Sequence, residues 1–385
     1  MTDKTYNVSA VFAAACAGMA FFGVTMLSLG PILGRLGDLG INAASISPTL
    51  TIGIIIGTLL FGPVVDRFGY KGLIIASSLL ALAGVLGLSS FTSGALLQVS
   101  ICILGIGGGV LNGLTNALVS DIYDDDKRGG RMSLLGAFYC IGALLWTLLN
   151  YFMTDYRYPL YIVSAAMVCF IIFFCCIQFP KAKPAENVTF SKTMSLFRYP
   201  ALLLFGLVLF FQSGLEGSSG DFTVTYLSKQ NGIDTGVATL AMTWFTIGML
   251  AGRLVLGSAL KAIKDIGTFY VYLGVALVGV AVLFFSKGPV GADIAMTLLG
   301  FGVGATFPVV LNHVGGIFRS LSGTAISIAV FIALVGQFAL KKLTSVAFNG
   351  GNYISLPCIL GIAIIAMMCL VPVALKAAKN TNKLS

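Results

Sequence analysis

Residues 62–72 read GPVVDRFGYKG and join two apolar runs, at 47–65 and 72–91. Each run is about 20 residues long, which is the length of an apolar helix that crosses a bilayer core about 30 Å thick. The joining stretch holds three glycines and three charged residues, Asp66, Arg67 and Lys71. Charged groups are costly in hydrocarbon, so this stretch predicts a tight polar link between two membrane-spanning helices.

The rest of the chain repeats this pattern. Hydrophobic residues make up 57% of its 385 residues and charged residues only 10%, against about 25% in soluble domains, and the mean hydropathy is +0.98. This composition predicts an all-α membrane protein with twelve transmembrane helices and no soluble domain. The twelve expected spans are 8–30, 47–65, 72–91, 95–120, 131–153, 158–179, 200–228, 235–260, 266–286, 289–313, 320–345 and 353–376.

The longest polar break, 180–199, divides the chain into an N-terminal six-helix bundle at 1–179 and a C-terminal six-helix bundle at 200–385. With these spans, 17 Lys and Arg residues lie on the side of the termini and the central loop, and 6 lie on the other side. The positive-inside rule therefore predicts that both termini are cytoplasmic. Short loops and short tails fit a bacterial inner membrane.

Glycines repeat between the two halves. A shift of 195 residues aligns them in two separate regions in one register: Gly57, Gly62, Gly72, Gly105, Gly107 and Gly109 fall on Gly252, Gly257, Gly267, Gly300, Gly302 and Gly304. Duplicated six-helix halves are typical of secondary transporters that alternate access around a site near the bilayer midplane.

The link at 62–72 also resembles the G-x-x-x-D-R-x-G-R/K-R/K loop of the major facilitator superfamily, with Tyr70 where the family usually has a basic residue. The resemblance implies the major facilitator fold of two pseudo-symmetric bundles. Its glycines permit a tight turn, and Asp66 at a helix end can pair with basic groups on a neighbouring helix. The stretch therefore predicts a gate latch, made by Gly62, Asp66, Arg67, Gly69 and Lys71.

Ionisable groups inside spans are functional candidates because their burial is expensive. Of fourteen acids, Glu216 and Asp221 lie inside an expected span, near Gly217 and Gly220, which would let the helix bend at a cavity. Gln212 is four residues before Glu216 and shares its face, whereas Asp221 lies about 140° round the helix. Both acids are candidates for proton coupling, and the alternative for each is a structural pairing with a neighbouring helix.

This span resembles the G-x-E…G-x-W/F…Y-L pattern of the fucose-permease-like branch, which includes sugar–proton symporters. That branch also carries acids in spans one and four. Residues 8–29 and 96–120 hold none, so the resemblance transfers proton coupling to Glu216 or removes it.

Other polar and aromatic residues inside spans are candidates for binding the solute. Amides both donate and accept hydrogen bonds, which suits hydroxyl-rich solutes, and they equally suit hydrogen bonds between helices. The tryptophans offer a stacking platform for a ring or a place in the core. The substrate candidates are Asn112, Asn116, Gln212, Glu216, Trp146, Trp244, Asn312 and Gln337.

Arg253 is assigned to the gate, with a carboxylate-binding cation as the alternative, and the single histidine, His313, is interpreted as structural.

Other function classes lack their motifs. The chain has no GxxxxGK[ST] motif for ATP, no Cys/His spacing for a metal and no basic stripe for nucleic acid. Its single histidine makes a Ser/His/Asp set for hydrolysis implausible. We therefore expect no enzyme, cofactor or metal site, and a monomer in the lipid bilayer. The predicted function is secondary transport of a small polar solute, favouring a monosaccharide with a proton on Glu216. A small carboxylate carrier, a drug exporter and a membrane sensor are the alternatives.

Overall fold

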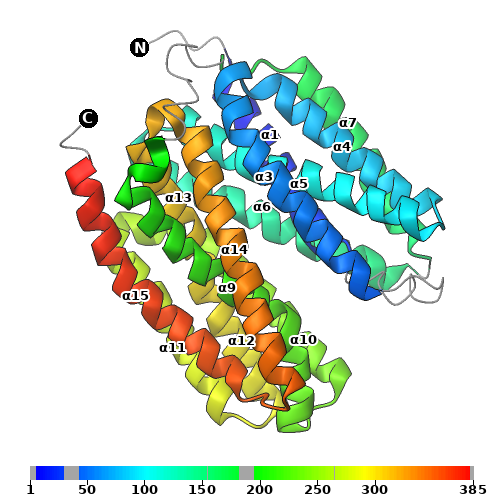
Figure 1. The fold of residues 1–385 in the computed structure, drawn as a ribbon, viewed down its shortest axis with the longest axis vertical. Coiled ribbons are helices and arrows are strands. Elements are labelled where there is room, and N and C mark those ends of the chain that lie inside the picture. Colours follow the sequence, from blue (N-terminus) through cyan, green and yellow to red (C-terminus); the bar gives the residue numbers. More distant parts are fainter. Residues whose placement is uncertain (1–5, 30–42, 154, 182–194, 264, 382–385) are drawn as a thin grey trace. The chain divides into compact units, whose positions relative to one another are not determined.

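A computed structural model describes residues 6–29, 43–153, 155–181, 195–263 and 265–381 (Figure 1). These residues form helices and no strand. The first half holds α1 (Val8–Leu27), α3 (Ala43–Phe68), α4 (Tyr70–Ser90), α5 (Gly94–Ile122), α6 (Asp125–Phe152) and α7 (Arg157–Cys176). The second holds η3 (Leu196–Arg198), α9 (Pro200–Asn231), α10 (Thr235–Ala262), α11 (Asp265–Phe285), α12 (Pro289–Gly304), α13 (Thr306–Ile317), η4 (Arg319–Leu321), α14 (Ser322–Asn349) and α15 (Ser355–Thr381).

The twelve predicted spans are confirmed, since the described residues contain 12 helical segments long and apolar enough to cross a membrane. The start of the fifth span differs most, because it is expected at 131 and the helix begins at Asp125. Its first turn is polar and was therefore left out by hydropathy, but Asp125 and Asp126 stabilise a helix N-terminus. Most of the predicted central loop, 182–194, lies outside the described residues.

The molecule consists of two compact units, and each includes one short segment from the other predicted half. Unit 1 consists of Met1–Asp124, Phe138–Thr193 and Phe318–Ser327. Unit 2 consists of Asp125–Ala137, Met194–Ile317 and Ile328–Ser385. The start of α6 therefore packs in unit 2, and the start of α14 packs in unit 1.

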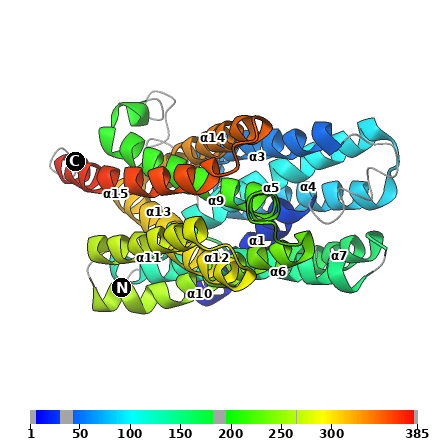
Figure 2. The same cartoon turned by 90° about the horizontal axis from the view of Figure 1, so that it is seen from below.

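Glycines let the helices of each unit approach closely. In unit 1, α5 lies against α3 and α4 (Figures 1 and 2), and a Cβ at Gly57 of α3 would overlap the carbonyl of Ile106 of α5. In unit 2, a Cβ at Gly252 of α10 would overlap the carbonyl of Phe301 of α12. Gly57 and Gly252 are 195 residues apart, and so are their partners Ile106 and Phe301. The offset found in the sequence therefore also relates these contacts. The same offset relates four further contacts of unit 1 to contacts of unit 2: Gly53–Cys102 to Gly248–Thr297, Gly105–Leu50 to Gly300–Phe245, Gly84–Leu104 to Gly279–Leu299, and Gly107–Ala81 to Gly302–Ala276.

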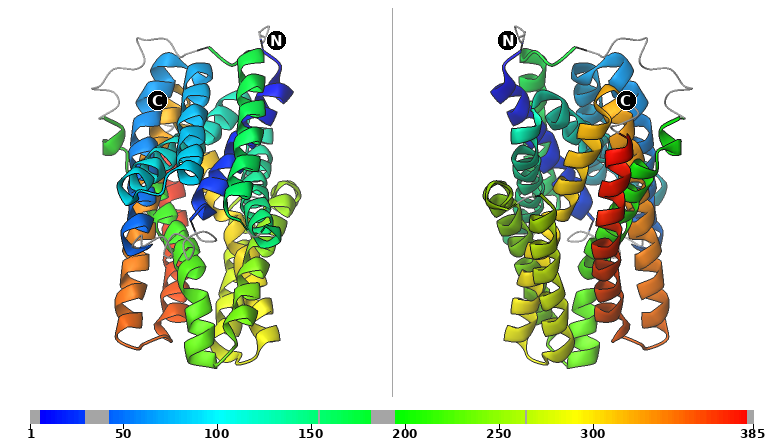
Figure 3. Two further views of the ribbon diagram at one scale, coloured as in Figure 1. Left: turned by 90° about the vertical axis from the view of Figure 1, so that its right-hand side faces the viewer. Right: turned by 90° about the vertical axis from the view of Figure 1, so that its left-hand side faces the viewer.

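Helix α9 carries both acids that the sequence places inside spans. It begins with Pro200 in its first turn and ends at Gly232, whose φ of 68° is the left-handed conformation that favours glycine at a helix end. It packs against α15 (Figures 1 and 3) and contacts α14 at Gly214 and Gly217. The Cβ of Leu340 would lie 2.9 Å from a Cβ at Gly214, so the small residues set the separation of α9 and α14.

Candidate functional site

Glu216 and Gln212 form a hydrogen-bonded pair on α9. The Nε2 of Gln212 donates to Oε2 of Glu216 at 2.9 Å, and the Ser213 hydroxyl donates to Oε1 of Gln212 at 3.1 Å. Gln212 is fully buried, and Glu216 is half-buried. Within the described residues Glu216 has no ion-pair partner, so a neutral amide orients this carboxyl group.

Asp221 has a different partner, because its Oδ2 lies 2.7 Å from Nζ of Lys341 on α14. A Cβ at Gly217 would lie 2.6 Å from Cε of Lys341 and 2.7 Å from Cγ of Gln337, so both side chains cross α9 at this glycine. The ion pair joins α9 to α14, which is the kind of structural pairing that the sequence offers as the alternative for Asp221.

The two asparagines of α5 bond to each other. Nδ2 of Asn116 donates to the backbone carbonyl of Asn112 at 2.8 Å and to its Oδ1 at 3.3 Å, and both side chains are buried. These bonds run along one helix, as expected from the spacing of four residues. They fix the two amides relative to each other.

The tryptophans have contrasting environments. Trp146 is fully buried in unit 1, and its Nε1 donates to the carbonyl of Leu27 at 2.8 Å. This burial fits the place in the core that the sequence left open for Trp146 beside a ring-stacking role. Trp244 of α10 is 43% exposed.

The side chain of the predicted latch residue Asp66, in α3, contacts the N-terminus of α14. Its carboxylate accepts hydrogen bonds from the backbone N–H groups of Gly323 and Thr324, at 3.3 and 2.9 Å, and from the Thr324 hydroxyl at 2.8 Å. The two N–H groups among these donors carry the positive end of the α14 dipole. Gly62 permits the approach, because a Cβ there would lie 2.7 Å from Cβ of Ser327.

The rest of the latch stretch has separate roles in unit 1. Gly69 has φ 81° and caps α4, which requires glycine, as the predicted tight turn does. Nζ of Lys71 donates to the carbonyl of Cys175 at the end of α7, at 2.8 Å, where a cation stabilises the helix C-terminus. The guanidinium of Arg67 lies 5.4 Å from the ring centroid of Phe68.

Asp121 is a site residue that the sequence analysis did not select. Its carboxylate accepts from the hydroxyl of Tyr70 and from the hydroxyl of Ser322, both at 2.6 Å. Tyr70 is the residue that departs from the family pattern, and that departure was the available signal. Asp66 and Asp121 therefore both hold the start of α14 in unit 1.

Arg128 of α6 is a further residue of this region that the sequence did not single out, and it contacts Asn312. Nε of Arg128 donates to Oδ1 of Asn312 at 2.9 Å, and its guanidinium pairs with Asp125. Asn312 thus binds the start of α6, which is the hydrogen bond between helices that the sequence left open for it beside a solute contact. Gly129 permits this close approach, because a Cβ there would lie 3.0 Å from Leu260 and 3.5 Å from Asn312.

Arg253 of α10 is buried, and its guanidinium donates to two backbone carbonyls. NH1 donates to the carbonyl of Gly136 in α6, and Nε donates to that of Gly304 at the end of α12, at 3.3 Å. A guanidinium engaged in this way supports a role in holding helices. It gives no support to the alternative role of binding a carboxylate.

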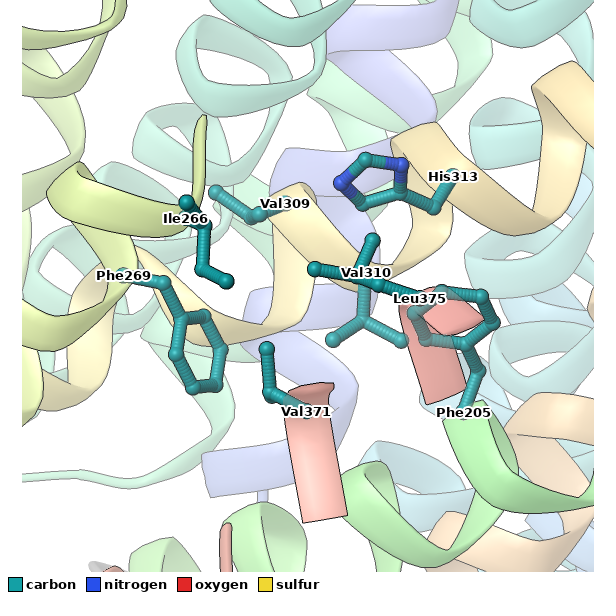
Figure 4. A pocket seen from close by; sticks show the side chains of 8 residues that line it. All are labelled: Phe205, Ile266, Phe269, Val309, Val310, His313, Val371 and Leu375. Atoms are coloured by element: carbon teal, nitrogen blue, oxygen red, sulfur yellow. The ribbon is translucent and has the colours of Figure 1, made fainter. Parts of the chain in front are cut away.

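A small apolar pocket in unit 2 contains none of the predicted solute-binding residues (Figure 4). Its lining includes His313, whose ring stacks on that of Phe205 with centroids 5.5 Å apart and planes 6° apart. This packing supports the structural interpretation of the histidine. The other lining residues are Ile266, Phe269, Val309, Val310, Val371 and Leu375.

Comparisons with known proteins agree on one family. The sequence profile of the Major Facilitator Superfamily matches residues 8–340. Among curated proteins, the TsgA homolog of Buchnera aphidicola is 21% identical over 336 residues, which cover 85% of this chain and 86% of that protein.

Among solved structures, the fucose:proton symporter FucP of E. coli superposes with a TM-score of 0.81 at 18% identity, covering 94% of this chain and 98% of FucP. The proton:xylose symporter XylE superposes with a TM-score of 0.72 at 17% identity, covering 94% and 95%. At these identities the two structures establish the shared fold.

Proposed function

The chain belongs to the Major Facilitator Superfamily of membrane transporters, and from that premise we propose that it carries a small polar solute, a monosaccharide, together with a proton that binds Glu216. The single observation that carries this proposal is the Gln212–Glu216 pair, a carboxyl group inside a predicted span whose hydrogen-bond partner is a neutral amide. Such a group can change its protonation state without leaving a cation unpaired. Asp221, by contrast, neutralises Lys341.

Proton binding and solute binding would act together. Protonation removes the charge of Glu216 and lowers the cost of closing apolar helices around it. Solute hydroxyl groups would bind the amides that face the same route, among which Gln212 and Gln337 lie on α9 and α14. Closure then favours the occluded state, and opening to the cytoplasm releases both ligands.

Two lines of support favour a sugar. The FucP and XylE structures share the fold and are symporters of sugars and protons. The span that holds Glu216 resembles that of the fucose-permease-like branch. We further propose that the protein lies in a bacterial inner membrane with both termini cytoplasmic, and that it works as a monomer.

The gate residues support alternating access. Asp66 and Asp121 hold the start of α14 within unit 1, and Arg128 and Arg253 hold the start of α6 within unit 2. Release of the contacts of Asp66 and Arg253 is the conformational step that we assign to the gate, and Gly62, Arg67, Gly69 and Lys71 are its other proposed residues.

The test is uptake by the full chain in proteoliposomes with an acidic exterior, with L-fucose and D-xylose as probes. We expect accumulation that requires the proton gradient. Glu216→Gln should reduce it to the level seen without a gradient while counterflow continues, because the amide cannot release a proton. Asp155→Asn, which alters an exposed carboxylate outside the spans, should retain gradient-driven uptake.

Unchanged gradient-driven uptake in Glu216→Gln would refute the assignment of the proton site. A thermal-shift panel identifies the cargo class, because a ligand that binds the folded carrier raises its melting temperature. Stabilisation by lactate or nicotinate alone would replace the sugar with a carboxylate, and stabilisation by lipophilic cations alone would indicate a drug exporter.

A further inference from the structure

The tenth span is broken where α12 ends at Gly304 and α13 begins at Thr306. Pro308 lies four residues after Gly304 and has no backbone N–H, so it cannot donate the helical hydrogen bond to the Gly304 carbonyl. The next carbonyl, of Ala305, accepts from Val309 N–H at 3.1 Å, so the helical ladder resumes immediately. The proline therefore frees one carbonyl inside a membrane span.

Arg253 supplies the missing donor. Its Nε donates to the Gly304 carbonyl at 3.3 Å, and its NH1 donates to the carbonyl of Gly136 in α6. A buried carbonyl without a donor is costly in a span, and so is a buried guanidinium without acceptors. Each group thus satisfies the other, and the same side chain ties the break to α6.

The repeat provides an internal comparison. Shifted back by 195 residues, Pro308 falls on Gly113 and Arg253 falls on Thr58. Gly113 has a backbone N–H, and the corresponding helix α5 runs unbroken from Gly94 to Ile122. Proline, helix break and arginine are thus found together in unit 2, while their counterparts in unit 1 lack all three.

Thr58 and Arg253 are alike in two other contacts. The Ser327 hydroxyl donates to the backbone carbonyl of Thr58, and the Ser133 hydroxyl donates to the backbone carbonyl of Arg253. The close helix contacts at Gly57 and Gly252 also correspond. The arginine therefore occurs only in the half that has the proline, whereas these other contacts occur in both halves.

We propose that Arg253 is a positioning residue that takes the place of the N–H absent at Pro308 and clamps the break in span ten to α6. Gly136 lies two residues before Phe138, where α6 passes from unit 2 to unit 1. The clamp therefore holds the last part of α6 that packs in unit 2. Span ten can bend at Ala305 when the guanidinium leaves the two carbonyls.

Hydrogen exchange on the purified full chain in nanodiscs tests this proposal without a known cargo. In Arg253→Gln we expect exchange at Val309 and Val310, and in residues 133–140 of α6, to become about tenfold faster or more, because a charged donor to a buried carbonyl is lost. Pro308→Ala restores an N–H that can bond the Gly304 carbonyl. In the Pro308→Ala background, the same arginine substitution should therefore accelerate exchange at Val309 and Val310 by only about two- to threefold.

The non-additivity is the decisive readout, because a merely structural arginine would add the same effect in both backgrounds. Equal acceleration with and without Pro308→Ala, or no acceleration at all, would overturn the proposal. Arg198→Gln is the matched control for loss of an exposed arginine and should leave these segments unchanged. If Arg253→Gln does not fold, Arg253→Lys carries the same comparison, since one ammonium group can serve one of the two carbonyls at a time.

Discussion

At the residue scale, Gly69 between α3 and α4 and Gly72 in the first turn of α4 have opposite structural demands. Gly69 has φ 81° and ψ −175°, a conformation that side-chain-bearing residues rarely adopt, whereas a Cβ at Gly72 would meet no atom within 4 Å. Gly69→Ala should lower the free energy of unfolding by about 1–3 kcal/mol. Gly72→Ala, inside α4, should change it little or raise it by up to about 1 kcal/mol. Thermal unfolding of both purified variants checks this, and equal effects would contradict the role of backbone conformation in this turn.

At the element scale, the glycine contacts fix how closely α3 approaches α5 and how closely α10 approaches α12. A Cβ at Gly252 would meet a backbone carbonyl, which cannot rotate away as a side chain can, so the helices must separate. Gly252→Ala should therefore destabilise the protein by about 1–3 kcal/mol. Gly274→Ala in α11 is the control, because a Cβ there would meet nothing within 4 Å. Chemical unfolding in detergent would reject this interpretation if both variants matched the parent chain.

At the scale of the whole molecule, the start of α14 packs in unit 1 and its remainder packs in unit 2, so the contacts of Asp66 decide where that helix is held. Asp66→Asn keeps the shape of the side chain and removes the charge that the helix N-terminus stabilises. We expect the exchange of amides in 322–327 to become about tenfold faster, since hydrogen bonds to a buried charged group contribute about 1.5–3 kcal/mol. Residues 338–349 of the same helix, and the control Asp155→Asn, should exchange as in the parent chain. Faster exchange along all of α14 would mean that Asp66 stabilises the helix generally.

The sequence by itself determined the twelve spans, the offset of 195 residues between the halves and the glycine-dependent turn at 69. The bilayer fixes the length of the apolar runs, backbone geometry governs residues close in the chain, and the offset is a repeat of the sequence itself. It also selected Glu216 and Gln212, because an i, i+4 pair on a helix is a local property.

Only the tertiary structure decided which partners these residues have. Tyr70 binds Asp121, Arg128 binds Asn312 and Arg253 binds the Gly304 carbonyl, across separations of 51, 184 and 51 residues. Trp146 is in the core, and Asp221 is paired with Lys341, although hydropathy treats both as residues of an ordinary span. The physical reason is that helix periodicity assigns a side chain to a face, whereas its partner depends on which helix packs against that face and at what height.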